Sequence, residues 1–374
     1  MTSAPTNASE SLRGDASRTA KPSHSSRSGL RWSLFTVGDN VRGGRRRADR
    51  FHEILDYVAE ANRLGYWAFF FAEHHFDPHG EVADPWLMVA AAAERTRHGG
   101  IRLGSMVSNL SFRNPVRVAE QALLANSLSK DRVEIGIGSG NVLQEHLAFG
   151  LHPEPLTKKR EAFDRAVPTF LAALEGGLVA APGHPAGSVQ IPLEPIQPAG
   201  PRVWMAAGRI EVAVRFASLG HSVAFGPPFV TMPGLSTLAE LVRQFREGLN
   251  GRPAPRIGAA FPTYVGPDAS SAVEALDRFL AQKHQDGNAH LLPEDRPNPS
   301  PVTAADLVHR NLAVIGTPHE AARQIDAITV TGITDFFAIP DFGALDPELV
   351  IPSLRELAKL ENLPTRSSPS RRIG

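Results

Sequence analysis

The sequence of 374 residues contains no cysteine, which excludes disulfides, thiolate metal sites and a cysteine nucleophile. It also has no excess charge, since 39 Lys and Arg balance 39 Asp and Glu, and so it lacks an electrostatic footprint for nucleic acid or an anionic membrane. No apolar run approaches the roughly 18 residues that span a bilayer, and the first residues lack the apolar core of a secretory signal. We therefore expect a cytoplasmic protein without nucleic-acid or membrane partners.

Composition indicates one folded domain between two tails. Hydrophobic residues make up 42% of the chain and charged residues 21%, as in ordinary globular proteins. Residues 1–29 contain almost nothing that packs, so we expect a disordered N-terminal tail, although their sparse acidic content also resembles a transit peptide. Residues 363–374 have a similar composition and are expected to form a flexible C-terminal tail. The folded domain is expected over residues 30–362.

Between the tails, short apolar runs of strand character alternate with longer segments of helical periodicity. The predicted strands are 31–37, 66–71, 101–107, 132–137, 202–206, 222–225, 256–263 and 333–339. The predicted helices are 50–64, 85–97, 115–128, 157–175, 210–219, 235–249, 268–284, 318–328 and 347–361. Most strands are apolar on both faces, which is typical of a parallel sheet covered by helices. We predict an α/β fold, a (β/α)8 TIM barrel with insertions, and keep a doubly wound open sheet as the alternative.

Several predicted helices begin with a side-chain acceptor followed by proline. The acceptor binds a free backbone N–H of the first turn, and proline supplies helical φ where no N–H is required. These dipeptides are Asp84-Pro85, Asn114-Pro115, Thr317-Pro318 and Asp346-Pro347. Glu320 also stands where a capping box with Thr317 requires it. Two segments interrupt the alternation, 176–200 and 285–311, and each is long enough to be an insertion or a lid near a site.

The segment FFFAEHHFDPHG at 69–80 places Glu73, His74 and His75 directly after an apolar strand. In a (β/α)8 barrel the residues that follow the strands build the active site. Metal binding is one interpretation of this cluster, with Asp77 and His79 as further ligands, but adjacent residues of an extended chain point to opposite faces and no ligand spacing supports it. The other interpretations are a histidine hydrogen-bonded in the barrel wall, and an imidazole in the barrel mouth that exchanges protons near neutral pH.

Two other strand ends have features of a phosphate site. IGIGSGNV is rich in glycine, but it is not a GxGxxG sequence with an acidic residue about 20 positions later. In WMAAGRIEVAVRFASLG a strand passes through Gly208 and Arg209 into a helix, which presents backbone N–H groups and a guanidinium at one point. A phosphate could dock there, and the alternative is a helix N-terminus with a solvated arginine.

The basic run RGGRRRADR at 42–50 is interpreted as a solvated loop rather than a nucleic-acid site, because it is flanked by glycines and the total charge is neutral. At the barrel mouth such a loop would attract an anionic substrate or cofactor, or the surface of a reductase.

Four ordered segments resemble the bacterial luciferase-like monooxygenases, which belong to a superfamily of flavin-dependent (β/α)8 enzymes. The segments are FFFAEHHF, RNPVRVAEQALLANSLSKDRVEIGIGSGN, PRVWMAAGRIEVAVRFASLG and VIGTPHEAARQI. The resemblance covers about residues 30–362. The order and spacing of the segments are specific for the superfamily and much less so for a substrate.

The resemblance implies that reduced FMN (FMNH2) binds over the strand C-termini and reacts with O2 to form a flavin C4a-(hydro)peroxide, which oxygenates an organic substrate. His74 is similar to the catalytic histidine of luciferase, and His75 is then expected to face the barrel wall. Met106-Val107 matches the place of a non-prolyl cis peptide beneath the flavin ring. The residues at positions of the family's cofactor contacts are Met106, Val107, Asn109, Gly138, Ser139, Gly140, Ala207, Gly208, Arg209 and Val212.

The sequence departs from luciferase at two of these positions. Luciferase has a reactive cysteine where this chain has Gly138, and an arginine that binds phosphate where this chain has Ser139. The first departure argues against light emission. The second suggests that Arg209, one strand away, replaces the lost cation.

The resemblance leads us to expect a two-component, FMN-dependent monooxygenase that acts on a small-molecule substrate and receives FMNH2 from a separate flavin reductase, because no second nucleotide-binding unit is visible in the sequence. The alternatives are an oxidoreductase that uses a deazaflavin coenzyme on the same barrel, and a non-catalytic flavin-binding relative. Family members generally form homodimers through the helices around the second and third strands. Such an interface would include Trp86, Leu87 and Ala90–Ala93.

Overall fold

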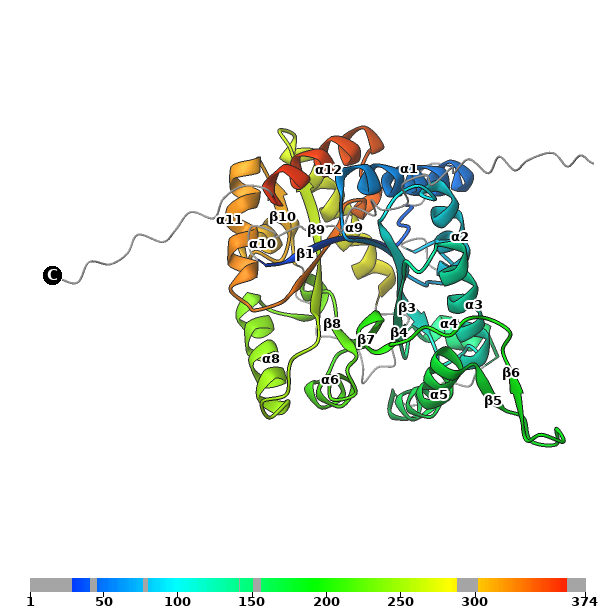
Figure 1. Cartoon of the computed structure of the whole chain (residues 1–374). Helices are drawn as coiled ribbons and strands as arrows, with labels where there is room; N and C mark the ends of the chain where they lie inside the picture. The colour runs from blue at the N-terminus through cyan, green and yellow to red at the C-terminus, as the bar shows by residue number, and fades with distance from the viewer. Residues whose placement is uncertain are drawn as a thin grey trace, which may run out of the picture.

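The computed structural model describes most of the chain between the predicted tails (Figure 1). The described residues are 29–40, 46–76, 80–140, 142–150, 156–287 and 302–361. The predicted tails, 1–29 and 363–374, lie outside them apart from Gly29. The predicted strands and helices are found, each within three residues of its predicted bounds.

Eight parallel strands of the described chain close into a barrel. They are β1 (Arg31–Thr36), β2 (Ala68–Phe71), β3 (Arg102–Asn109), β4 (Val133–Gly138), β7 (Val203–Ala207), β8 (Ser222–Phe225), β9 (Ile257–Val265) and β11 (Asp335–Ile339). Their order around the ring is the order along the chain, and parallel β8–β9, β9–β11 and β11–β1 pairings complete the closure. The predicted (β/α)8 barrel is confirmed, and the alternative of an open sheet is wrong.

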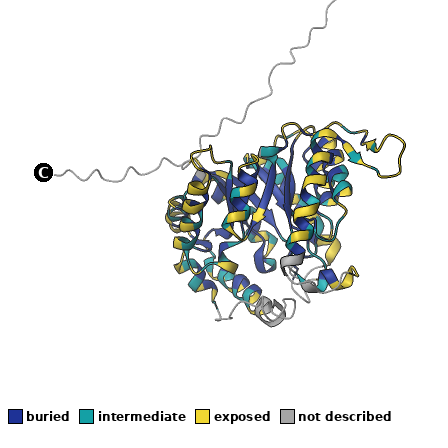
Figure 2. Ribbon diagram, turned by 90° about the horizontal axis from the view of Figure 1, so that it is seen from below, coloured by how far each residue is buried: buried dark blue, intermediate teal, exposed yellow. Residues whose placement is uncertain are grey.

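Helices surround the ring, with their buried faces toward the strands and their exposed faces outward (Figure 2). The predicted helices are α1 (Arg47–Leu64), α2 (Pro85–Arg95), α3 (Pro115–Leu128), α5 (Leu156–Gly176), α6 (Ile210–Ala217), α8 (Leu235–Gly248), α9 (Ala269–Gly287), α11 (Pro318–Thr329) and α12 (Pro347–Glu361). Short helices that the sequence did not indicate are α4 (Leu143–Ala148), α7 (Pro228–Thr231) and α10 (Ala304–His309). Among the described residues, no helix combines the length and the apolar character that crossing a bilayer requires.

The predicted helix starts are confirmed. A side-chain oxygen accepts a backbone N–H of the first turn in the helices that begin after Asp84, Asn114, Thr317 and Asp346. Thr317 and Glu320 form the reciprocal capping box. Each such cap stabilises the protein by about 1 kcal/mol, and together they fix where α2, α3, α11 and α12 leave the barrel loops.

Three strands lie outside the ring. In the predicted insertion 176–200, β5 (Leu178–Ala180) and β6 (Ser188–Gln190) form an antiparallel hairpin that projects from the barrel in Figure 1. β10 (Val314–Gly316) pairs with the last residues of β9, beyond the part of β9 that pairs with β11. In the second predicted insertion, α9 continues to Gly287 and α10 follows, while residues 288–301 lie outside the described chain.

Aromatic rings from non-adjacent strands meet inside the barrel. Phe70 of β2, Trp204 of β7 and Phe337 of β11 are mutually in contact, with ring centroids 5.3 to 6.2 Å apart and mostly edge-to-face geometry. Gly258 of β9 makes room for them, because a Cβ there would lie 2.4 Å from Phe337 and 3.1 Å from Trp204. Such pairs contribute about 0.5–1.5 kcal/mol each beyond the area they bury. We call these three rings the aromatic plug.

Candidate active site

The C-terminal ends of four neighbouring strands form one side of the barrel mouth. β2 pairs with β3, β3 with β4, and β4 with β7, so the segments that follow these strands are neighbours. The residues predicted from the sequence stand on these strand ends or in the first turn of α6: His74, Met106, Val107, Asn109, Gly138, Ser139, Gly140, Ala207, Gly208, Arg209 and Val212. The structure therefore brings all of them to one end of the barrel.

His74 lies at the mouth with its side chain 30% exposed. Its backbone N–H donates to the carbonyl of Val82 at 3.0 Å. Its imidazole packs on Gly80, where an added Cβ would lie 2.6–2.7 Å from ring and Cβ atoms of His74. His74 Nδ1 lies 3.9 Å from Glu145 Oε1. The imidazole thus has one side against the protein, one nitrogen facing a carboxylate, and access to the mouth.

His75 lies in the barrel wall, as the sequence led us to expect. Its Nε2 lies 3.2 Å from Glu73 Oε1, and its backbone N–H donates to Glu145 Oε1 at 2.8 Å. Its ring contacts Phe112 and Phe149 edge-on, with centroids 5.7 and 4.8 Å away. The alternation of an extended chain explains why adjacent histidines differ, since one faces the mouth and the other the packed wall.

Glu73 is buried and holds this wall together. Besides His75, its carboxylate accepts the backbone N–H of Asn109 at 3.3 Å and the guanidinium of Arg113 at 2.9 Å. Arg113 also donates to Asp84 at 2.9 Å, so the residue that caps α2 is linked to the strand ends. Burial alone lowers the pKa of Arg113, but the two carboxylates outweigh it and raise the pKa above its ordinary value. A buried carboxylate with these partners has a structural role rather than the role of a catalytic base.

Glu145 is a site residue that the sequence did not single out. It is fully buried on α4, and it connects α4 to the histidine segment through the contacts to His74 and His75. Gln144 of the same helix donates to the carbonyl of Phe76 at 3.0 Å. α4 has six residues and no side-chain cap, so neither periodicity nor a cap motif marks it in the sequence. Only the closed barrel brings Glu145 against the segment that follows β2.

Aromatic side chains line the mouth beside the histidines. Phe112 stacks on Phe149 with centroids 5.1 Å apart, and Phe76 lies 5.5 Å from Phe149. His146 of α4 packs edge-on against Phe112 at 5.4 Å. Burial, with a smaller effect of Lys159, lowers the pKa of His146 to about 4, so this imidazole is neutral at pH 7. The group forms an apolar wall around His75, the neighbour of His74.

The floor of the mouth consists of small residues. The predicted cis peptide between Met106 and Val107 is present. A Cβ at Gly138 would lie 2.6 Å from Val107 Cγ2 and 3.7 Å from the Cβ of Ala206, so the three residues are in contact. Ala206 is exposed although it lies within β7. A planar ring can therefore approach the backbone here, which fits a flavin.

The end of β7 offers anion-binding groups. Gly208 and Arg209 are both exposed, and no side chain caps the N-terminus of α6. The first-turn N–H groups of α6, which include that of the half-buried Val212, and the exposed Arg209 thus stand together at this strand end. Free N–H groups at a helix N-terminus together with an arginine are a common arrangement for phosphate. This arrangement fits the phosphate of FMN.

Other predicted contacts differ in detail. The Asn109 side chain is buried, its amide donates to the Glu73 carbonyl at 3.5 Å, and it lies against Gly140, where an added Cβ would be 3.3 Å from its Cγ. The Ser139 carbonyl accepts the hydroxyl of Ser111, and the half-buried Gly140 has φ of +61°, which suits glycine.

No group of three or more His, Asp or Glu side chains among the described residues could hold a metal ion. Asp77 and His79, which the metal interpretation would need, lie outside the described residues, as does Asn141 of the glycine-rich segment.

The prediction that the basic run at 42–50 is a solvated loop is wrong for Arg50. This side chain is fully buried in α1 and pairs with the buried Asp341 at 2.5 Å. It also donates to the Asp39 carbonyl at 2.9 Å. Asp39 and Asp341 follow β1 and β11, so Arg50 ties together the ends of these two neighbouring strands. Arg47 is exposed and pairs with Glu81, and residues 41–45 lie outside the described chain.

The chain belongs to the luciferase-like monooxygenase family, whose model matches residues 30–335. The uncharacterized protein y4wF of Sinorhizobium fredii is 30% identical over 324 residues, which are 83% of this chain and 91% of that protein. The limonene 1,2-monooxygenase of Rhodococcus erythropolis is 36% identical over 114 residues, which are 30% of this chain and 29% of that enzyme.

Solved structures share the fold. The monooxygenase RslO1 of Streptomyces bottropensis superimposes with a TM-score of 0.71 at 21% identity, over 88% of this chain and 98% of that chain. The oxygenating constituent of 3,6-diketocamphane monooxygenase of Pseudomonas putida, in complex with FMN, has a TM-score of 0.67 at 16% identity, over 89% and 98%. An F420-dependent secondary alcohol dehydrogenase has a TM-score of 0.60 at 19% identity, over 87% and 99%. These structures show that the chain shares the barrel fold. They include both an FMN-bound and an F420-dependent enzyme, so the fold alone does not identify the coenzyme.

Proposed function

We propose that this protein is the oxygenase of a two-component flavin monooxygenase, which takes reduced FMN from a separate reductase and uses O2 to oxygenate a small organic substrate. The observation that carries the proposal is the barrel mouth, where the partly exposed His74, the small residues at the ends of β4 and β7, and the exposed arginine at the start of α6 all stand at strand ends on one side. Family membership and the FMN-bound diketocamphane enzyme support it.

The residues of the mouth fit FMN in two parts. Val107, Gly138 and Ala206 leave a flat surface for the ring, and Gly208 with Arg209 offers N–H groups and a positive charge for the phosphate. When bound, reduced FMN supplies the electrons that activate O2. A guanidinium is suited to this task because its planar fork matches phosphate oxygens.

His74 is proposed to hold or move a proton at its exposed imidazole. A carboxylate 3.9 Å from Nδ1 attracts a proton-bearing ring, so Glu145 positions His74 and favours its role as an acid or hydrogen-bond donor. Glu145 also fixes the following backbone N–H, which limits movement of the histidine segment. Phe112 and Phe149 contact the neighbouring His75 and add apolar surface beside the histidine segment, which lowers the access of water to the site.

A separate reductase is proposed because the described residues form one barrel and contain no second nucleotide-binding unit. The trigonelline enzyme of Acinetobacter baylyi, a relative 29% identical over 111 residues, is described as an oxygenase component, which supports the same division. A proposed homodimer is supported by Leu87 on α2 and Leu124 and Leu128 on α3, which are 71%, 52% and 56% exposed. The expected contacts through Trp86, Ala92 and Ala93 are wrong, because these residues are buried in the protomer's own core.

The proposal is tested by incubating the purified protein with FMNH2, O2 and a panel of apolar organic substrates, followed by mass spectrometry. We expect a product heavier by one oxygen atom, and 18O2 should supply that atom. A protein that binds reduced F420, transfers hydride without consuming O2 and forms no oxygenated product would instead support the deazaflavin alternative. The F420-dependent relatives make this the necessary comparison.

A further inference from the structure

A second cleft lies at the end of the barrel opposite to the mouth. Its volume is about 570 Å³, which is within the range of small-molecule sites. It is lined by residues at or before the first positions of the strands, and among them are Arg31 of β1, Arg102 of β3, Arg202 before β7 and Arg256 before β9. Trp67, just before β2, forms part of its wall. We call it the arginine cleft.

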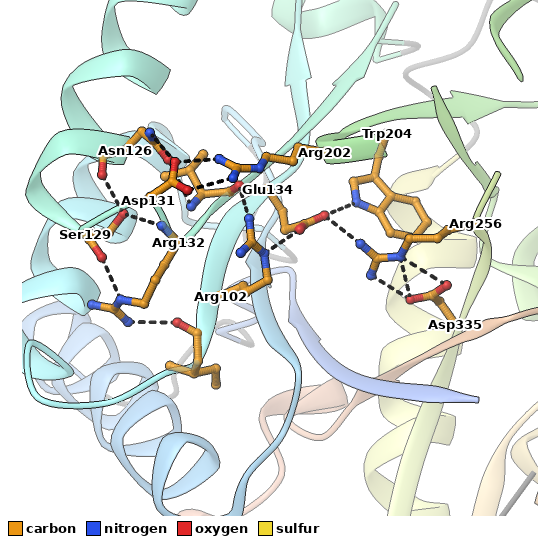
Figure 3. A network of polar contacts seen from close by, with 12 residues as sticks. Arg102, Asn126, Ser129, Asp131, Arg132, Glu134, Arg202, Trp204, Arg256 and Asp335 are labelled. Atoms are coloured by element: carbon orange, nitrogen blue, oxygen red, sulfur yellow. Dashed lines mark hydrogen bonds and ion pairs between the residues drawn. The ribbon is translucent and has the colours of Figure 1, made fainter. Parts of the chain in front are cut away.

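Three of these arginines belong to an ion-pair lattice that Figure 3 shows. Glu134 of β4 accepts from Arg102 at 2.5 Å and from Arg256 at 3.0 Å, and Arg256 also pairs with Asp335 at 2.7 Å. Arg202 forms a two-pronged pair with Asp131, with both N···O distances 2.7 Å. The lattice therefore uses three carboxylates to neutralise three guanidinium groups.

Arg31 is outside the lattice. Its guanidinium lies over the Trp67 ring at 4.9 Å from the centroid, and among the described residues no carboxylate pairs with it. Arg256 and Arg102 approach the same ring at 5.4 and 5.9 Å, so three cations surround one indole. Burial and the repulsion of Arg256, followed by that of Arg102 and only partly offset by Asp335 and Glu134, lower the pKa of Arg31 below its ordinary value.

A fifth arginine adds to the excess of positive charge. Arg132 follows the turn before β4 and donates to the hydroxyl of Thr96 and to backbone carbonyls, including that of Ile101. Burial and then Arg102 lower its pKa. The four arginines that line the cleft exceed by one the three carboxylates that pair with them, and Arg132, which is buried and does not line the cleft, adds a further positive charge nearby. Neighbouring cations repel one another, so a partly open cleft that they line favours the binding of an anion.

We propose that the arginine cleft is a binding site for a small organic or inorganic anion of at least two negative charges, whose phosphate or carboxylate oxygens pair with Arg31. Guanidinium matches either group through parallel N–H···O bonds. Arg31 supplies the free donors, Arg102 and Arg256 supply the surrounding potential, and Glu134 keeps those two side chains in place. This site is independent of the flavin chemistry proposed for the mouth.

The test is calorimetric titration of the full chain with pyrophosphate and, separately, with citrate, at constant ionic strength. We expect saturable binding of at least one anion, and the comparison identifies whether phosphate or carboxylate is preferred. Arg31→Gln should weaken binding about 10-fold or more, because a hydrogen bond to a charged group is lost. The matched control is Arg243→Gln, an exposed arginine on α8 away from both the cleft and the mouth, which should bind as the wild type does.

The expected result has a second readout. A bound anion should raise the melting temperature of the wild type and of Arg243→Gln but not that of Arg31→Gln, because only binding to the folded state shifts unfolding. If Arg31→Gln fails to fold, Arg31→Lys replaces it, and it should also bind more weakly since it lacks the planar fork. Absence of saturable binding by both anions, equal binding by the Arg31 variant, or loss of binding in Arg243→Gln overturns the proposal.

Discussion

At the N-terminal end of the barrel, Glu134 and Asp335 are buried and paired with arginines, and the side chains satisfy one another. At the C-terminal end, His74 is partly exposed, glycine and alanine leave space at the ends of β4 and β7, and Arg209 is exposed before an uncapped helix. The first end is built from long paired side chains and the second from short ones. Polar groups that complete each other stabilise a fold, whereas polar groups directed at open space are placed for a ligand.

The largest expected effect comes from removing the histidine of the mouth. His74→Ala is expected to lower product yield about 10²–10⁴-fold, the range for loss of an acid or base group, while FMN binding is retained. Product formation by mass spectrometry and FMN titration measure the two effects. Near-normal yield from a folded variant would show that His74 is not the catalytic group.

At the opposite end, Arg256→Met is expected to lower the free energy of unfolding by about 3–5 kcal/mol, because Asp335 and Glu134 lose a buried partner. Urea unfolding measures this change. The control is Arg243→Met on the outer face of α8, whose pairs with Glu240 and Glu247 are exposed, so little change is expected. Equal stability of the two variants would contradict the role given to the lattice.

As the pH falls, protonation of His146 at the mouth should lower the stability of the protein before the ion pairs of the lattice are broken. The pKa of His146 is lowered to about 4, so between its ordinary pKa and 4 the unfolded chain binds a proton that the folded chain does not. The free energy of unfolding should therefore fall by about 2–3 kcal/mol from pH 7 to pH 4. Arg202 lowers the pKa of Asp131 to about 2, so this pair persists in that range. His146→Gln should flatten the pH dependence of the urea midpoint, and an unchanged slope would refute the assignment.

The smallest expected effect concerns the phosphate of FMN. Arg209→Gln should weaken FMN binding about 10- to 100-fold by loss of a charged hydrogen bond, and Arg209→Lys should weaken it less. Flavin fluorescence titration measures the dissociation constant. Arg215→Gln is the matched control, since Arg215 is exposed on the same helix and pairs with Asp164. If both glutamine variants bind FMN alike, the phosphate lies elsewhere.

The barrel could be predicted from the sequence because its signals are local. Apolar runs of strand length and caps such as Thr317 with Glu320 depend on neighbours in the chain, and these elements appear within three residues of their predicted bounds. The short β10 carries no such signal, because three residues give no periodicity and its pairing partner is remote in sequence. The same limit applies to α4.

The site was predictable only where chemistry follows a strand directly. His74 and Arg209 stand at strand ends, so the barrel alone brings them to the mouth. Glu145 and Arg50 could not be found in this way. Glu145 reaches His74 across 71 positions of sequence, and Arg50 reaches Asp341 across 291, and both contacts exist only once the ring has closed. A charge run such as that at 42–50 looks solvated until the fold supplies a buried partner.

The aromatic plug stands between the two ends, and its Trp204 donates its indole N–H to Glu134 at 2.7 Å. The plug is thus joined to the charged lattice, and neither of them includes a residue of the mouth loops. Mouth loops from another family member could therefore be grafted onto this barrel without changing the aromatic plug or the ion-pair lattice. Because of the same separation, substitutions in the mouth loops can change substrate recognition with little effect on thermal stability.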